Sequence, residues 1–281
     1  MERTKRLVLK IALTAVAAYV ICVAMVAITQ THILFPVGMA DAHTPRLPPH
    51  AQTMTARTAG GLRLVGTRLP PAKAQDETVL VLGFGGNATN ADATAIMLHA
   101  LLPEADIVAF HYRGYGQSEG APSAEALRAD ALVVHDHAVA AVKPDKVIAV
   151  GMSIGAGVAA YLARKRSIAG LILVTPFDSL AALAKHHYPW APVDLFLRHR
   201  MPTRGDLEGR PTPTALIAGA RDRIVPAKRT AALRQAVAKL VLDRTIADAG
   251  HNDIYGRREF VAAMRTAYRR ITAPGAGGPA R

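Results

Sequence analysis

A serine flanked by glycines follows a short apolar run and has the setting of a nucleophile. The run VIAVGMSIGAG, residues 147–157, places Ser153 in the pattern G-x-S-x-G. Residues 147–150 predict a strand and the residues from Ile154 onward predict a helix, so Ser153 is expected on the sharp turn between them. Glycines two positions before and after would let strand and helix pass closely, which offsets their cost of about 0.5–1 kcal/mol each. The alternative is a tight turn with an incidental serine.

A serine hydroxyl is a poor nucleophile without a base, and the sequence supplies one. Asp222 follows a predicted strand at 215–218, and His251 follows a weaker one near 242–247. This chain order, serine then acid then histidine, is the order that a nucleophile on such a turn requires. We expect His251 to take the Ser153 proton and later to protonate the leaving group, while Asp222 holds the imidazole in the right tautomer.

The acid has a rival, and each assignment has a structural alternative. Asp178 in TPFDSL follows another predicted strand and is the competing acid. Asp222 could instead cap a helix or join a surface ion-pair cluster with Arg221 and Arg223. His251 could be an ordinary loop histidine. Position in the chain favours the catalytic interpretation of Asp222 and His251.

A second glycine-rich loop, GFGGNATN at residues 83–90, follows the first core strand and is expected beside the nucleophile. The backbone N–H groups of Ile154 and Asn87 are the predicted oxyanion-hole donors, and Gly86 is expected to contact substrate. Loss of one such donor typically costs about 2.7–4 kcal/mol of transition-state stabilisation. The alternatives are a simple glycine-rich turn or a phosphate site, but neither phosphate-loop spacing is present.

Residues 178–210 lack a core strand and form a predicted insertion over the sheet. The insertion combines aromatic and aliphatic residues with several prolines, and it holds the only tryptophan, Trp190. An apolar segment over the carboxyl ends of the strands suits an acyl pocket, so Trp190 is a predicted substrate contact. The alternative is that these side chains only fill the core beneath the segment.

Metal and thiol chemistry find little support in the sequence. Cys22 is the only cysteine and sits in an apolar segment, which excludes a disulfide framework, a cysteine metal site and a thiol nucleophile. His135 and His137 are two apart on a predicted helix and point to different faces, and we expect no metal. His186 and His187 are adjacent in the insertion and are expected to line or cap it.

The N-terminus predicts a signal anchor. Residues 11–28 are apolar, close to the ~20 residues that span a bilayer. A cleaved signal peptide is the main alternative, but the one small-x-small site ends at Ala42, far from Ile28. A buried soluble helix is a weaker alternative. Four basic residues lie in residues 1–10, and the next is Arg46. The positive-inside rule therefore puts the N-terminus in the cytoplasm and the catalytic domain on the far side of the membrane.

The formal net charge is +13, which raises nucleic-acid binding as a function class. The basic residues are scattered and do not interleave with aromatics, so no nucleic-acid partner is expected. For a membrane-tethered domain, attraction to an anionic lipid surface is the simpler interpretation, together with a small-molecule or lipid-like acyl substrate.

The elements around these residues predict a mostly parallel sheet with helices on both faces, because short apolar strands alternate with helical stretches. A hairpin is predicted around Gly60-Gly61. The predicted strands are 79–84, 107–110, 147–150, 171–174, 215–218 and 242–247, and the predicted helices are 91–102, 123–142, 154–164, 227–239 and 254–270. The predicted organisation is a basic N-terminus (1–10), an anchor (11–28), a linker (29–51), a catalytic domain (52–270) and a disordered tail (271–281).

Taken together, the motifs resemble the α/β-hydrolase superfamily, and most of all its membrane-anchored serine-hydrolase branch with depalmitoylase-like and peptidase-like members. The resemblance covers roughly 52–270 and rests on GFGGNATN, HYRGYGQSEG, GMSIGAG, TPFDSL, GARDRIVP and GHND. It implies an α/β-hydrolase fold of about eight strands, the triad Ser153, Asp222 and His251, and no cofactor. It also implies that the YRGYG segment, residues 112–116, shapes the loop beside the oxyanion hole.

One departure from the resemblance concerns that loop. Relatives usually carry His-Gly-Asn-Ala where this chain has Gly85-Gly86-Asn87-Ala88. The missing imidazole removes no backbone donor, but it bears on the loop's rigidity and substrate range. The expected function is hydrolysis of carboxylic esters or thioesters by a membrane-tethered serine hydrolase. The alternatives are an amidase or peptidase with the same triad, and a silent scaffold that binds lipid or protein.

Overall fold

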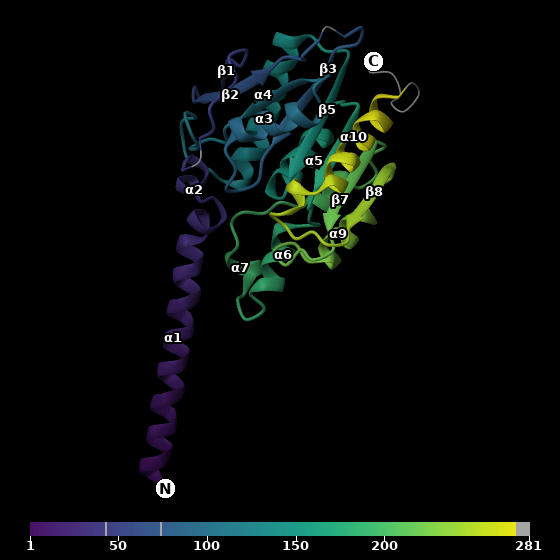
Figure 1. Ribbon diagram of the computed structural model, residues 1–281. Coiled ribbons are helices and arrows are strands. Elements are labelled where there is room, and N and C mark those ends of the chain that lie inside the picture. Colours follow the sequence, from purple (N-terminus) through teal and green to yellow (C-terminus); the bar gives the residue numbers. More distant parts are fainter. Residues whose placement is uncertain (43, 74, 274–281) are drawn as a thin grey trace.

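A sheet of eight strands organises the chain in the computed structural model, which describes residues 1–42, 44–73 and 75–273 (Figure 1). The strands are β1 (Gln52–Arg57), β2 (Arg63–Leu69), β3 (Val79–Phe84), β4 (Asp106–Phe110), β5 (Lys146–Met152), β6 (Gly170–Val174), β7 (Thr214–Gly219) and β8 (Leu240–Ile246). Their order is β1-β2-β4-β3-β5-β6-β7-β8. The β1–β2 and β2–β4 pairs are antiparallel and the rest are parallel, so the predicted mostly parallel sheet is confirmed.

The apolar strands bury both faces of the sheet, because successive side chains point to opposite sides. In β3, Leu80 and Leu82 belong to one hydrophobic cluster, whereas Val79 and Val81 belong to the other. The first cluster includes residues of α4 (Ala124–Val142), α5 (Ile154–Lys165) and α9 (Ala227–Arg234). The second includes residues of α3 (Ala91–Leu101) and α10 (Arg258–Thr272). The predicted two-sided cover is therefore confirmed.

The insertion between β6 and β7 consists of three short helices. They are α6 (Leu180–His187), α7 (Val193–Phe196) and α8 (Thr203–Leu207). Pro192 and Pro202 stand at the N-caps of α7 and α8, where proline starts a helix without losing a hydrogen bond. The segment projects from the body of the domain on the same side as the N-terminal helix (Figure 1).

The N-terminus forms a long helix, α1 (Glu2–Leu34), followed by the short α2 (Val37–Asp41). At 1.5 Å per residue, a helix of 33 residues is about 50 Å long, more than the ~30 Å hydrocarbon core of a bilayer. Within the described residues it is the one helix long and apolar enough to cross a membrane. Its far end joins the domain, because Phe35 is fully buried in the core (Figure 1).

Three boundaries differ most from those that the sequence predicts. The N-terminal helix continues through residues 29–34, where a linker was expected, and Gln30 and Thr31 there hydrogen-bond the insertion. The helix predicted over 227–239 ends at Arg234, since the following residues turn the chain into β8. The helix predicted from Ile254 begins as the 3₁₀ turn η1 (Ile254–Gly256), and α10 follows it. Residues 274–281 of the predicted tail lie outside the described residues.

Candidate active site

Ser153 occupies the turn between β5 and α5, at the carboxyl edge of the parallel strands. Its backbone has φ 52° and ψ −115°, a conformation that residues with a Cβ rarely adopt. Such strain costs about 1–3 kcal/mol and persists only where the surroundings enforce it. One restraint is the Ser153 N–H, which donates to the Val174 carbonyl at 2.9 Å. The turn therefore holds the serine in a fixed, strained conformation.

The two glycines of the motif are needed because backbone atoms pass close to them. A Cβ on Gly151 would lie 2.4 Å from the Gly155 carbonyl oxygen. A Cβ on Gly155 would lie 2.1 Å from the Phe84 carbonyl oxygen, at the end of β3. Both distances are below any normal contact, and both involve main-chain atoms. The glycines thus let α5 start directly against β3 and β5.

His251 lies in the loop between β8 and η1 and reaches the serine. Its Nε2 is 3.0 Å from the Ser153 Oγ, and its Nδ1 is 2.7 Å from Asp222 Oδ2. An ionised carboxylate only accepts hydrogen bonds, so Nδ1 carries the proton toward Asp222. Nε2 is then the free acceptor for the serine hydroxyl. The side chains of His251 and Asp222 are 9% and 3% exposed, so the hydrogen bond between them is screened from solvent.

Asp222 is fixed by its own loop after β7. Its Oδ1 accepts the N–H groups of Ile224 and Val225 at 2.9 and 2.7 Å, which leaves Oδ2 for His251. The neighbouring Arg221 pairs with Asp248. The geometry therefore orients one carboxylate oxygen toward the imidazole.

The rival acid Asp178 is engaged elsewhere. Its Oδ2 accepts from Arg229 Nη1 at 3.1 Å, and the ion pair is largely buried. Among the described residues, His251 has Asp222 and Ser153 as its hydrogen-bond partners. The structure thus places Asp222, and not Asp178, next to the histidine.

The glycine-rich loop after β3 lies against the nucleophile. A Cβ on Gly86 would point to the Ser153 Cβ at 3.9 Å, so this glycine faces the serine. Ile154 is the first residue of α5, and its N–H is therefore one of the free donors of a helix start. The Asn87 side chain is turned away and donates to the Leu34 carbonyl of α1 at 3.2 Å.

Two tyrosines of the YRGYG segment donate hydrogen bonds to backbone carbonyls of that loop. The Tyr112 hydroxyl donates to the Gly85 carbonyl and the Tyr115 hydroxyl to the Asn87 carbonyl, both at 2.8 Å. Burial raises the pKa of both phenols, so each stays a neutral donor. These bonds hold two carbonyls of the loop in place.

The sequence interpretation missed Tyr255 and the contact between Asn87 and Leu34. Burial and, more weakly, the carboxylate of Asp222 raise the pKa of Tyr255 to about 12. Nothing in GHNDIYG distinguishes Tyr255 from an ordinary aromatic. The Asn87 contact joins segments 53 residues apart, and no local pattern reports such a pairing.

Trp190, the predicted substrate contact, lies at the tip of the insertion. Its ring packs edge-on against Tyr19 of α1 at 6.4 Å and against Tyr188 at 6.3 Å between centroids. Its carbonyl accepts the Tyr19 hydroxyl at 3.0 Å. The tip is thus docked on the N-terminal helix. The described residues contain no group of three or more metal-ligating side chains.

Fold and geometry together define a class of proteins: a mostly parallel sheet that carries serine, histidine and aspartate at its carboxyl edge. The family model described as alpha/beta hydrolase fold matches residues 79–207. An uncharacterised protein of Mycobacterium tuberculosis is 33% identical over 225 residues, covering 79% of each chain. The lysophosphatidylserine lipase of Danio rerio is 33% identical over 131 residues, covering 44% of this chain and 34% of its own.

A solved esterase of Pyrococcus furiosus superposes with a TM-score of 0.67 at 16% identity, covering 82% of this chain and 96% of the esterase. This chain belongs to the α/β-hydrolase family. Family membership and the esterase and lipase relatives support a hydrolase. The bond that it cleaves depends on the residues of the site and not on the fold.

Proposed function

We propose that this protein is a membrane-tethered serine hydrolase that cleaves carboxylic ester or thioester substrates through an acyl-enzyme intermediate. The observation that carries the proposal is the hydrogen-bonded series from the Ser153 Oγ through His251 to Asp222. The strained backbone of Ser153 adds to it, because such strain concentrates at functional sites.

In the first half-reaction, His251 Nε2 takes the hydroxyl proton while the Ser153 Oγ attacks the acyl carbon. The carbonyl electron pair moves onto the oxygen, and the N–H groups of Ile154 and Asn87 donate to the resulting oxyanion. The electron pair on the oxyanion then re-forms the carbonyl, and the bond to the alkoxide or thiolate breaks. The leaving group takes the proton from Nε2. Asp222 stays ionised throughout and stabilises the imidazolium.

In the second half-reaction, a water replaces the leaving group. His251 takes one water proton as the hydroxide oxygen attacks the acyl-serine carbonyl. Collapse of the second tetrahedral intermediate returns the proton to the Ser153 Oγ and releases the carboxylic acid. Protein side chains supply every proton transfer in this cycle, so it requires no cofactor.

The membrane attachment follows from the N-terminal helix. We propose that α1 is an uncleaved anchor with residues 1–10 in the cytoplasm and the catalytic domain on the other side. The excess of basic residues supports attraction of that domain to an anionic lipid surface. The substrate in this setting is a small or lipid-like acyl compound, and nucleic acid has no part in the proposal.

The test is a hydrolysis panel with purified full-length protein in detergent micelles. Acetyl esters, acetyl thioesters and acetyl anilides are compared for the wild type, Ser153→Ala and Ser167→Ala. Ser167 is an exposed serine just after α5 and serves as the matched control. We expect ester and thioester hydrolysis by the wild type and Ser167→Ala, and loss of both activities in Ser153→Ala.

Other outcomes of the same panel contradict the proposal. Preferential cleavage of the anilide would assign the triad to an amidase or peptidase. Ester hydrolysis that survives in Ser153→Ala would remove the serine from the mechanism. No hydrolysis of any substrate by the wild type, with no labelling by a fluorophosphonate, would favour a silent scaffold.

A further inference from the structure

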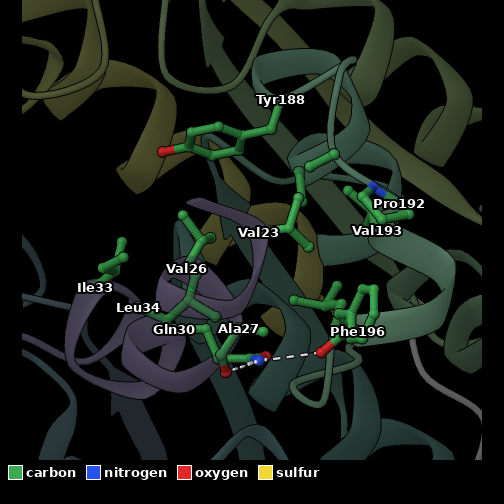
Figure 2. A pocket seen from close by; sticks show the side chains of 13 residues that line it. Val23, Val26, Ala27, Gln30, Ile33, Leu34, Tyr188, Pro192, Val193 and Phe196 are labelled. Carbon is green, nitrogen blue, oxygen red and sulfur yellow. Dashed lines mark hydrogen bonds between the residues drawn. The ribbon is translucent and has the colours of Figure 1, made fainter. Parts of the chain in front are cut away.

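An apolar cavity separates the N-terminal helix from the insertion (Figure 2). Its volume is about 130 Å³, close to the ~150 Å³ of an apolar cavity that holds a benzene molecule. One wall comes from α1 and the other from the insertion. The lining side chains include Val23, Ala27, Gln30 and Leu34 on α1, and Ala184 and Phe196 opposite.

The one amide in this wall is fully engaged, so the cavity offers no free amide to a polar ligand. Gln30 is 6% exposed; its Nε2 donates to the Phe196 carbonyl at 3.0 Å (Figure 2), and its Oε1 accepts the Arg198 N–H at 2.8 Å. Thr31 and His199 bond at 2.7 Å one residue further along each segment. These polar contacts fix the insertion against the helix and leave hydrocarbon facing the cavity.

The charged residues of α1 set the position of this helix in the bilayer, and with it the depth of the insertion. With residues 1–10 on the cytoplasmic side, the apolar span starts at about Ile11 and extends to about Ile28. Arg198 bonds the carbonyls of Ala27 and Ile28, whereas Trp190 contacts Tyr19. Nine residues of helix separate Tyr19 from Ile28, or about 13 Å, most of the ~15 Å hydrocarbon depth of one leaflet.

The tip of the insertion, Tyr188–Leu197, has a surface suited to that depth. Trp190, Leu195 and Phe196 are exposed, so moving their apolar surface from water into hydrocarbon is favourable. The acidic Asp194 is ion-paired with Lys185 at 2.6 Å, so the tip does not carry an unpaired carboxylate into the leaflet.

One residue of the cavity wall contacts the loop beside Ser153. Leu34, in its wall, accepts a hydrogen bond from the Asn87 side chain. The adjacent Gly86 faces Ser153. The upper end of the cavity is therefore next to the predicted oxyanion loop, while its lower end lies at the depth of Val23.

From this arrangement we propose that the insertion tip is embedded in the leaflet beside α1, and that the cavity between them takes the acyl chain of a lipid drawn directly from that leaflet. The inference rests on the proposed function for the fate of the lipid, which is hydrolysis at Ser153. The occupant is a segment of a long acyl chain of a membrane-resident ester, because the cavity has room for only a few carbons, both walls are hydrocarbon and one of them is the membrane helix.

The depth of the tip is measured by fluorescence of Trp190, the only tryptophan of the chain. Full-length wild-type protein is reconstituted in phosphatidylglycerol–phosphatidylcholine vesicles whose acyl chains carry bromine at defined carbons. We expect bromine on the acyl chains to quench Trp190 and aqueous iodide to have little effect. Quenching by iodide, with no effect of acyl-chain bromine, overturns the placement. This measurement requires no catalysis, so it stands if the proposed function fails.

The cavity is tested by filling it. Ala27→Phe places a ring in the cavity, and Ala24→Phe places the same ring on the exposed face of α1 as the matched control. Hydrolysis of 4-methylumbelliferyl palmitate in vesicles and of the acetate in solution are compared. For Ala27→Phe we expect at least a tenfold loss on the palmitate and less than a twofold change on the acetate, and for the control no change on either.

Ala184→Phe fills the same cavity from the opposite wall and covers the case that Ala27→Phe does not fold. Equal palmitate hydrolysis by the cavity and control variants overturns the acyl site. If the wild type hydrolyses neither ester, the proposed function is contradicted instead. The absence of acetate hydrolysis by the wild type distinguishes this outcome from failure of the acyl site.

Discussion

Replacing Gly155 by alanine tests whether the elbow requires the close packing seen between α5 and β3. The added methyl would lie 2.1 Å from the Phe84 carbonyl oxygen and 2.6 Å from the Gly85 carbonyl oxygen. Both are main-chain atoms of the strand end and of the oxyanion loop, so no side-chain rotation relieves the contact. The start of α5 must move away from β3, and Ser153 must move with it.

The cost follows from the packing density of the interior. Inserting a methyl group into a packed core costs typically 1–3 kcal/mol, and contact with main-chain atoms puts this variant at about 3 kcal/mol. For a domain of this size each kcal/mol lowers the melting temperature by about 2–4 °C, so we expect a fall of about 6–12 °C. Ester hydrolysis should fall by at least a hundredfold, because Ser153 and the predicted oxyanion donor Ile154 move with the start of α5.

The assay is thermal unfolding by circular dichroism of the full chain in detergent, with hydrolysis measured on the same samples. Gly205→Ala is the matched control, since a Cβ there meets nothing within 4 Å and alanine favours the helix α8. The control should melt at the wild-type temperature or slightly above it. A Gly155→Ala variant with wild-type melting and activity would refute the steric account of the motif.

Three further predictions concern the acid, the orientation and a surface ion pair. Asp222→Asn should lower turnover on the order of 10⁴-fold and Asp178→Asn far less, in steady-state kinetics; the reverse ranking would move the acid. A reporter that works only outside the cytoplasm should be active when it is fused after Arg46. If only a reporter that works in the cytoplasm is active at this position, the orientation is refuted. Arg166 lowers the pKa of Asp136 from 3.8 to about 2. The pair therefore stabilises the folded state above about pH 4 and less as the pH falls toward 2. Arg166→Gln should lower the melting temperature of the protein at pH 6 and lower it much less near pH 2.5. An equal fall in melting temperature at both pH values would contradict this.

The sheet was predictable because its strands are locally encoded. The run at 79–84 and the other core strands are continuous apolar segments, and each appears where the sequence predicts one. Element ends were less predictable, as at Arg234, because a helix stops where the fold requires the chain to turn.

The spacing of Ser153, Asp222 and His251 along the chain predicted which loops meet at the carboxyl edge of the sheet. Parallel strands bring these loops together whatever the details of packing. The docking of the insertion on α1 had no such signal. Thr31 and His199 are 168 residues apart, and neither segment shows in its own sequence that the other covers it.

The central claim, that Ser153 is an activated nucleophile, is tested most directly by mapping a covalent adduct. Full-length protein is treated with a fluorophosphonate, digested, and analysed by mass spectrometry, with Ser153→Ala and Ser167→Ala in parallel. If Ser153 is the activated nucleophile, we expect a single adduct on the peptide that contains Ser153. The adduct should be present in Ser167→Ala and absent from Ser153→Ala. An adduct on another serine, or no adduct on a protein that hydrolyses esters, would contradict it.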